Sequence, residues 1–229
     1  MSTNSAPKDI RTKAFVLRRT NYGEADRILN LITPQGKMSV IAKGVRKEKS
    51  KLAGNIEMFC LIDLNIHAGR SEFGVVTSAK MLEFYNSLIS DFKKMELATL
   101  FIKEINRVSE NSDSPEFFSV LSQVFIALEQ GVNSELVESW FWFNVAKACG
   151  EEINLYRDAA GKKLEAETAY LWDVAESALR EHPNGNINTD EIKIMRLMLT
   201  SKLETVSRVK NIAGSMSDIL RIAKAVNKI

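Results

Sequence analysis

Hydrophobic positions follow two different periods along this chain, and the change comes near residue 83. From residue 12 to residue 82, apolar and β-branched residues occur in five short runs, which are TKAFVLRR, DRILNLIT, KMSVIAKG, NIEMFCLIDLNIHAG and EFGVVTSAKML. Such runs, bounded by turn residues, are typical of β-strands. Five strands with one long connection after the third favour a small closed β-barrel such as an OB-fold.

After residue 83 the apolar residues recur every three to four positions, which predicts helices. Six segments have this period, at residues 92–108, 114–131, 133–150, 164–182, 187–199 and 215–229. The third segment is apolar nearly all round at residues 140–143, so we expect it at the centre of the helical part. Asn188 and Glu191 have the spacing of a capping box at the start of the fifth. Residues 151–165 lose the period, and we expect a loop or a small hairpin there.

These patterns predict an α+β protein of two modules. We expect residues 1–82 to form a five-stranded OB-fold barrel that binds nucleic acid, with residues 1–10 as a disordered tail, and residues 83–229 to form an all-α helical domain. No apolar run approaches the roughly 20 residues that a membrane span needs. The first residues, MSTNSAPKD, lack the apolar centre of a secretion signal, so we expect a cytoplasmic protein with no membrane partner.

Cysteine and histidine are too few and too dispersed for a built-in zinc site. The chain has Cys60, Cys149, His67 and His182, and none of them stands in a CxxC or HxxxH spacing. A structural zinc site takes four such ligands at close spacing. We therefore expect no metal, no cofactor and, in a reducing compartment, no disulfide.

Positive charge is concentrated in the strand-rich part. Residues 1–85 carry 14 Lys or Arg against 8 Asp or Glu, a balance of +6, whereas residues 86–229 carry 17 against 21, a balance of −4. The segment AKGVRKEKSK, residues 42–51, follows the third predicted strand and holds five basic residues. Basic side chains on one surface neutralise phosphates and release counterions, which binds nucleic acid with little sequence preference.

We therefore expect a nucleic-acid site formed by this segment and by basic residues of neighbouring strands. The candidate contacts are Arg18, Arg19, Lys37, Lys43, Arg46, Lys47, Lys49, Lys51 and Arg70. Aromatic side chains that could stack on bases are few here, namely Tyr22, Phe59, Phe73 and Phe84, and we expect Phe59 and Phe73 in the core. The alternative is a Lys-rich loop that only keeps the protein in solution. We interpret Gly44 as a backbone requirement.

No sequence feature points to catalysis. The chain lacks the GxxxxGK[ST] loop of nucleotide hydrolases and the GxSxG of many esterases, and neither His stands in a motif that pairs it with a nucleophile. The adjacent acids Glu151 and Glu152 end a predicted helix, where such a pair is usually solvated. We expect a non-enzymatic protein without catalytic residues.

Several short motifs of the strand-rich part occur in a family-specific order. Together they resemble the N-terminal domain of RecO, a family of bacterial recombination mediators. The family pattern is YGE followed by Asp two positions on, a Thr-to-Gly hairpin, and an A-K-G-x-R run that ends in Lys-Ser. The matching residues are Tyr22, Gly23, Glu24, Asp26, Thr33, Gly36, Ala42, Lys43, Gly44, Arg46, Lys49 and Ser50. The helical remainder agrees with the family in length and layout.

The YGEAD segment, residues 22–26, also has a structural interpretation, which we favour. Gly23 would supply a turn, and Glu24 or Asp26 would pair with Arg27 or with a Lys of the basic segment, because turn-forming acids normally seek partners.

The resemblance implies an OB-fold followed by a helical domain, binding to single- and double-stranded DNA, and annealing of complementary strands. It also implies cooperation with RecR in loading RecA onto DNA covered by single-strand binding protein. Many family members have a four-cysteine zinc site after a helix that ends in Gly. Here Cys149 and Gly150 end that helix and NLYRDAAGKKLE lacks the cysteines, so we expect Leu155 and Tyr156 to pack there instead.

Two functions of other classes stay open from the residues alone. The acidic, apolar-rich helical part favours a protein-interaction adaptor whose barrel takes an acidic peptide tail in place of DNA. A third possibility is an OB-fold protein that binds RNA.

Overall fold

The computed structural model describes residues 8–68, 73–151, 153–209 and 216–227. The chain forms two compact units, Met1–Leu121 and Ser122–Ile229. Five strands come first and most of the helices follow, which confirms the predicted α+β class.

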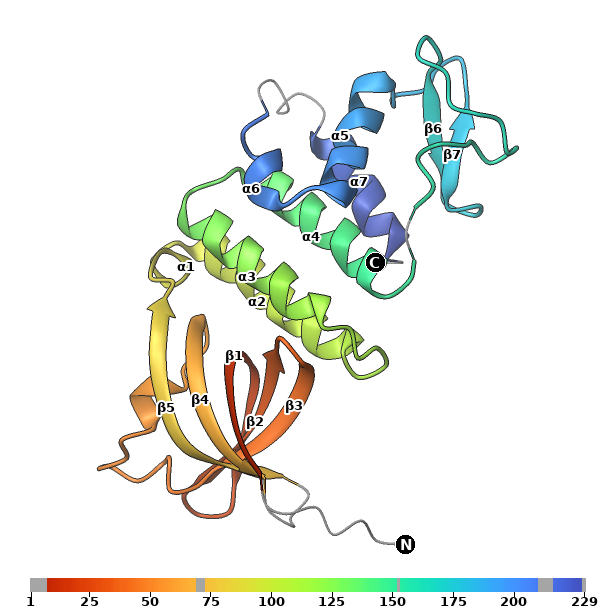
Figure 1. Ribbon diagram of the computed structural model, residues 1–229. Coiled ribbons are helices and arrows are strands. Elements are labelled where there is room, and N and C mark those ends of the chain that lie inside the picture. Colours follow the sequence, from red (N-terminus) through yellow and green to blue (C-terminus); the bar gives the residue numbers. More distant parts are fainter. Residues whose placement is uncertain (1–7, 69–72, 152, 210–215, 228–229) are drawn as a thin grey trace, which may run out of the picture. The chain divides into compact units, whose positions relative to one another are not determined.

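The strands of the first unit close on themselves as a barrel (Figure 1). They are β1 (Lys8–Tyr22), β2 (Asp26–Thr33), β3 (Gly36–Ala42), β4 (Cys60–Ala68) and β5 (Gly74–Phe84). Neighbours pair in the order β1-β2-β3-β5-β4, and β4 pairs back with β1. All pairs are antiparallel except β3 with β5, which run parallel.

Alternation along the strands fills the barrel with apolar side chains. Successive side chains on a strand point to opposite faces. Ala14, Leu29, Val40, Leu64 and Val76 all belong to the buried cluster inside the barrel. The pairing register of β1 with β2 shifts between Val16 and Arg18.

Helices of the same unit follow the barrel. They are α1 (Ser87–Ser90), α2 (Phe92–Val108) and the first part of α3 (Glu116–Glu129). The carboxylate of Asp91 accepts hydrogen bonds from the amides of Lys93 and Lys94, at 2.9 and 3.2 Å, and so caps α2. Phe15, outside the barrel, packs against Phe118 of α3 with ring centroids 5.4 Å apart. In Figure 1, α2 lies across one end of the barrel, and the β1–β2 turn lies at the other end.

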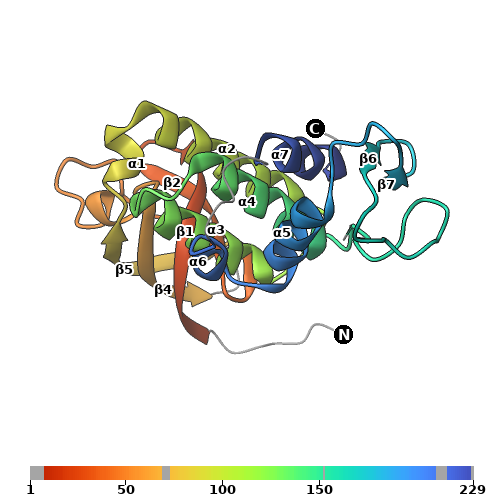
Figure 2. The same ribbon diagram turned by 90° about the horizontal axis from the view of Figure 1, so that it is seen from above.

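The second unit is built around α4 (Ser134–Ala148), seen from above in Figure 2. Residues 140–143 are all buried, which confirms the predicted central helix. Helix α7 (Met216–Val226) packs along α4, where the ammonium of Lys224 lies 2.8 Å from a carboxylate oxygen of Glu138. Helix α5 (Thr189–Thr200) begins with the predicted capping box of Asn188 and Glu191, and α6 (Leu203–Val206) follows it.

The prediction of a helix over residues 164–182 is wrong, and with it the prediction of an all-α second half. This segment forms a hairpin of β6 (Tyr170–Asp173) and β7 (Ala178–Glu181). The backbone of Tyr170 exchanges two hydrogen bonds with Ile187, at 2.8 and 3.0 Å, and the amide of Ala159 donates to Leu179 O at 2.7 Å. These contacts with segments distant in sequence override a local composition that favours helix.

Other differences from the sequence-based elements are smaller. Strand β1 begins at Lys8, so residues 8–10 are not part of a disordered tail, and residues 1–7 lie outside the described residues. The fourth strand begins at Cys60, after a 3-10 turn at Ala53–Asn55, and not at residue 55. The change from strands to helices falls between Phe84 and Ser87, whereas the first compact unit continues to Leu121.

Residues 153–187 form a lobe that is held by hydrogen bonds and by one arginine of α5. The predicted small hairpin is confirmed by an antiparallel bridge between Arg157 and Lys163. The guanidinium of Arg196 donates to Leu155 O through Nε and Nη2, at 3.0 and 2.6 Å. The central carbon of this guanidinium, Cζ, also lies 4.7 Å from the centroid of the Tyr156 ring. Leu155 is buried as expected, and Tyr156, although 62% exposed, packs its ring against this guanidinium.

We expect Arg196→Met to loosen this lobe selectively. The change removes two charged hydrogen bonds and one cation–π contact, so amides of residues 155–170 should exchange about tenfold faster, since such a bond contributes about 1.5 kcal/mol or more. Hydrogen exchange with mass spectrometry measures this, and α4 should stay protected. Arg208→Met, which removes only an exposed ion pair with Glu204, is the control. Equal exchange in both variants would contradict the role of Arg196.

Candidate nucleic-acid interface

The basic segment leaves β3 as a compact loop docked on the β1–β2 turn. We call residues 43–51 the basic loop. The amide of Gly44 donates to the carboxylate of Asp26 at 2.7 Å. The amide of Arg46 donates to Ala25 O at 2.8 Å, and its Nη1 donates to Gly23 O at 3.3 Å. The loop and the turn therefore form one continuous surface.

Local sequence explains this docking. Gly23 and Gly44 have φ of +54° and +62°, values that L side chains rarely adopt, which confirms that both are backbone requirements. Val45 is buried in the barrel cluster and anchors the loop from within. Asp26 is structural as expected, although it accepts from a backbone amide and not from Arg27 or a Lys side chain.

Five of the nine predicted contacts lie together on this loop. Lys43, Arg46, Lys47, Lys49 and Lys51 are all exposed. Across the described part of the chain, none of the five forms an ion pair with a carboxylate. Because their charges are not neutralised by the protein's own acids, they are available to an external polyanion.

The other four predicted contacts are placed differently. Arg18 is exposed on the outer face of β1. Arg19 forms an ion pair with Glu57. Lys37 is at the opposite end of β3 from the basic loop; its Nζ donates to Asn106 O at 3.0 Å and lies 3.7 Å from Glu110 Oε1. Arg70 lies outside the described residues. Arg19 and Lys37 are thus engaged with internal partners.

The sequence analysis named Arg18 and Tyr22 as candidates but missed the apolar side chains that lie with them on the outer face of β1, β2 and β3. The pairing register places Tyr22 opposite Asp26, and Ile28 between Thr20 and Ile41. These side chains point away from the barrel interior, because their neighbours Leu29 and Val40 point into it. Tyr22 is 55% exposed. The signal was the strand alternation, which the sequence analysis applied only to the core.

A second group of basic residues was also missed, on the outer face of β1, β4 and β5. There Lys13 and Lys80 pair across the strands with Asp63. Arg11 donates to Asp63 through Nη2 at 2.6 Å. This hydrogen bond, with the charges of Arg11, Lys13 and Lys80, holds the pKa of Asp63 below its usual value. In this group the acid is paired with the basic residues, whereas Glu48 of the basic loop forms no ion pair among the described residues.

The residues at the position of the family's zinc site do not fit a zinc ion. No group of three or more His, Cys, Asp or Glu suited to a metal occurs in the described parts of the chain. Cys149 is exposed at the end of α4, and Cys60 is buried in the barrel. The lobe after α4 is organised instead around Arg196 and backbone hydrogen bonds.

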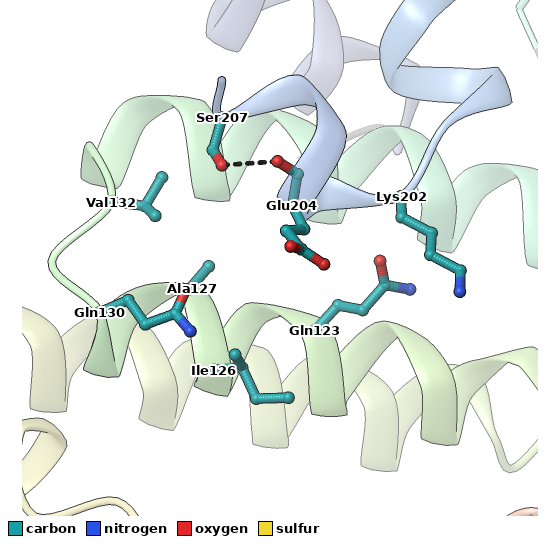
Figure 3. A pocket seen from close by; sticks show the side chains of 8 residues that line it. All are labelled: Gln123, Ile126, Ala127, Gln130, Val132, Lys202, Glu204 and Ser207. Carbon is teal, nitrogen blue, oxygen red and sulfur yellow. Dashed lines mark hydrogen bonds between the residues drawn. The ribbon is translucent and has the colours of Figure 1, made fainter. Parts of the chain in front are cut away.

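A pocket between α3 and α6 in the second unit has no catalytic arrangement (Figure 3). Its volume is about 220 Å³, and its lining mixes amide, apolar and charged side chains. Ser207 Oγ donates to the backbone oxygen of Glu204 at 2.9 Å, and Gln123 Oε1 accepts from the amide of Leu203 at 3.0 Å. No histidine lines it that could activate Ser207.

No helix in the described segments is both long enough and apolar enough to cross a membrane.

We expect Asp26→Ala to release the basic loop from the turn. The change removes a charge-assisted hydrogen bond, so trypsin should cleave after the loop's Lys and Arg residues about tenfold faster, for a bond of about 1.5 kcal/mol. Timed digestion with mass spectrometry measures the rate. Glu24→Ala removes an exposed acid from the same turn and should leave the rate unchanged. If both variants are cleaved at the wild-type rate, the carboxylate does not hold the loop.

The two cysteines should differ sharply in reactivity. Burial, together with the nearby charge of Glu57, raises the pKa of the Cys60 thiol to about 11, and the thiolate is the reactive form. A disulfide reagent at pH 8 should therefore modify one thiol in the folded protein and two thiols in denaturant. Cys149→Ser should abolish the modification of the folded protein. Modification of two thiols in the folded protein would show that the barrel core opens.

Comparison with known proteins divides the chain near the point where strands give way to helices. The family model "Recombination protein O N terminal" matches residues 8–85, and "Recombination protein O C terminal" matches residues 89–226. A DNA repair protein RecO of Dehalococcoides mccartyi is 29% identical over 213 residues, which cover 89% of this chain and 83% of the relative.

Further relatives carry the same name. The DNA repair protein RecO of Roseiflexus sp. (strain RS-1) is 33% identical over 151 residues, which cover 66% of this chain and 53% of the relative. The DNA repair protein RecO of Syntrophobacter fumaroxidans is 27% identical over 205 residues, which cover 87% of this chain and 82% of the relative. Since the C-terminal model alone matches more than half of the chain, and the N-terminal model adds the barrel with its basic loop, this chain belongs to the recombination protein O (RecO) family.

Proposed function

We propose that this protein is a non-enzymatic recombination mediator in DNA repair that binds single- and double-stranded DNA and anneals complementary strands. The observation that carries the proposal is the basic loop, whose five exposed cations have no carboxylate partner among the described residues. Membership of the RecO family supports the role in repair and recombination. Cations on one surface lower the repulsion between two phosphate backbones, which annealing requires.

The DNA-binding domain in this proposal is an OB-fold built from the five strands between Lys8 and Phe84, and the mainly helical remainder of the chain follows it. Five strands in a closed barrel, with a long connection after the third, support the OB-fold assignment. In OB-folds the face of the second and third strands binds oligonucleotides, together with the loops that join strands 1 and 2 and strands 4 and 5. The basic loop borders that face, whereas Lys37 lies at its far end and is a weaker candidate contact.

The proposed partners beyond DNA follow from the family alone. With RecR, the protein would help RecA load onto single-stranded DNA covered by single-strand binding protein, in the cytoplasm and at the nucleoid. No metal or other cofactor takes part in the proposal. The helical unit would supply protein-binding surface. A strand-annealing assay with and without RecR tests this part separately from DNA binding.

A protein-interaction adaptor is the second candidate function. The mixed-charge pocket between α3 and α6 and the acidic balance of residues 86–229 favour a protein partner for the helical unit. In this alternative the basic loop would receive an acidic peptide tail. Titration of the purified protein with labelled DNA across a salt series separates the two, since an adaptor would bind no DNA at any salt.

Changing Lys43, Arg46 and Lys47 together to Ala should weaken DNA binding and make it less dependent on salt. Each lost phosphate contact reduces the magnitude of the negative slope of log K against log salt by about 0.7 for single strands. Three lost contacts should therefore reduce it by about 2. Fluorescence anisotropy at several salt concentrations measures both effects. A matched variant changes Lys162 and Lys163, exposed in the lobe, to Ala, and should bind normally. Unchanged affinity of the triple variant at low salt would remove the basic loop from the DNA site.

A further inference from the structure

The outer face of β1, β2 and β3 carries three successive rows of side chains. The row at the basic loop contains Tyr22 and Asp26, with Lys43 directly after the end of β3. The next row contains Thr20, Ile28 and Ile41.

On the side away from the loop, Arg18 pairs with Asn30, and Asn30 pairs with Ser39. The row with Ile28 and Ile41 therefore lies between two others. One of these has Tyr22 and Lys43, and the other has Arg18.

The apolar row is neither core nor ordinary polar surface. Ile28 and Ile41 are directly paired and only partly buried, although most apolar side chains of the barrel point inward. The row continues onto β5, because Ile41 is also the partner of Val75, which is partly buried too. Three β-branched apolar side chains thus form a continuous strip across three strands.

Tyr22 stands at the edge of this strip, beside the docked basic loop. Its side chain is 55% exposed at the end of β1. The next residue, Gly23, accepts the hydrogen bond from the Arg46 side chain, so the guanidinium lies against the turn that follows Tyr22. An exposed ring beside cations suits a base that stacks while its phosphate is neutralised.

We propose that Tyr22 and the strip of Ile28, Ile41 and Val75 receive unpaired bases and make this face selective for single strands. The inference rests on the proposed DNA-binding function and names the form of DNA that this face prefers. Phosphates of either form can reach the basic loop, because they lie on the outside of the nucleic acid. Bases of a duplex are stacked on each other and cannot lie on a protein ring, whereas bases of a single strand can.

The experiment compares Tyr22→Ala with Tyr22→Phe on three labelled ligands. These are a single strand of about 16 nucleotides, the upper site size of one OB-fold, the matching duplex, and a single strand of equal length whose sugars carry no bases. Tyr22→Ala should weaken binding to the normal single strand about tenfold, as expected for one lost stack. It should leave unchanged the affinity for the duplex, the affinity for the base-free strand and the salt dependence of binding. Tyr22→Phe should bind like the wild type, because the ring remains.

Two further variants make the result specific to this face. Ile41→Thr keeps the branching at Cβ but replaces the ethyl group with a hydroxyl, and it should weaken only binding to the normal single strand. Phe92→Ala removes a ring that is 72% exposed at the start of α2, outside this face, and should change nothing. Thermal unfolding of each variant checks that the barrel stays folded.

The outcomes separate this inference from the function on which it rests. Equal weakening of single strand and duplex by Tyr22→Ala, or no weakening of either, would overturn the stacking role, even if the basic-loop variant loses affinity. Failure of the proposed DNA-binding function would appear instead as no binding of any of these ligands by the wild-type protein at any salt.

Discussion

Pairing of β2 with both β1 and β3 is the constraint on which the site depends. The first half of β1 pairs with β4 and the second half with β2, and the register shift between Val16 and Arg18 lies where one partner gives way to the other. The barrel is closed by pairing of β4 with β1 and of β5 with β3, the latter through only two residue pairs. The pairing of β2 with β3 sets Arg27 opposite Ala42 and so places the β1–β2 turn beside the point where the chain leaves β3. The docking of the basic loop on that turn, through Asp26 and Ala25, is possible only because of this neighbourhood.

In the docked loop, backbone amides and one apolar side chain hold the structure, and the basic side chains carry the charge. Its amides at Gly44 and Arg46 are satisfied by oxygens of the turn, and Val45 anchors it in the core. The loop therefore keeps its shape without ion pairs from its lysines, whose ammonium groups remain in solvent. A loop held by its own salt bridges would have neutralised the charges that a polyanion needs. Arg19 and Lys37 illustrate that alternative, since both contact acidic residues of the protein.

The second unit shows how a lobe can be organised without metal ligands. Helix α4 is buried on all sides and supports α5 and α7. From α5, Arg196 reaches the carbonyl oxygen of Leu155 and the ring of Tyr156, and so ties the lobe to the helices. A guanidinium has several donors in a fixed plane, which allows one side chain to hold a backbone oxygen by two hydrogen bonds. Residues 153–187 contain no cysteine, and these contacts hold the lobe to the helices.

The sequence by itself determined the periods of the elements and the concentration of charge. Alternation predicted the five strands, the 3.6-residue period predicted α2, α3, α4, α5 and α7, and the glycines and basic residues of the loop were visible as a motif. Tertiary structure alone decided which charges stay free, because the partners of Arg19 and Lys37 are 38 and 69 residues away in the chain. It also decided the β6–β7 hairpin, where pairing of Tyr170 with Ile187 outweighed local helix propensity. Contacts between residues distant in sequence leave no periodic signal, and for that reason the composition of the proposed DNA-binding surface required the fold.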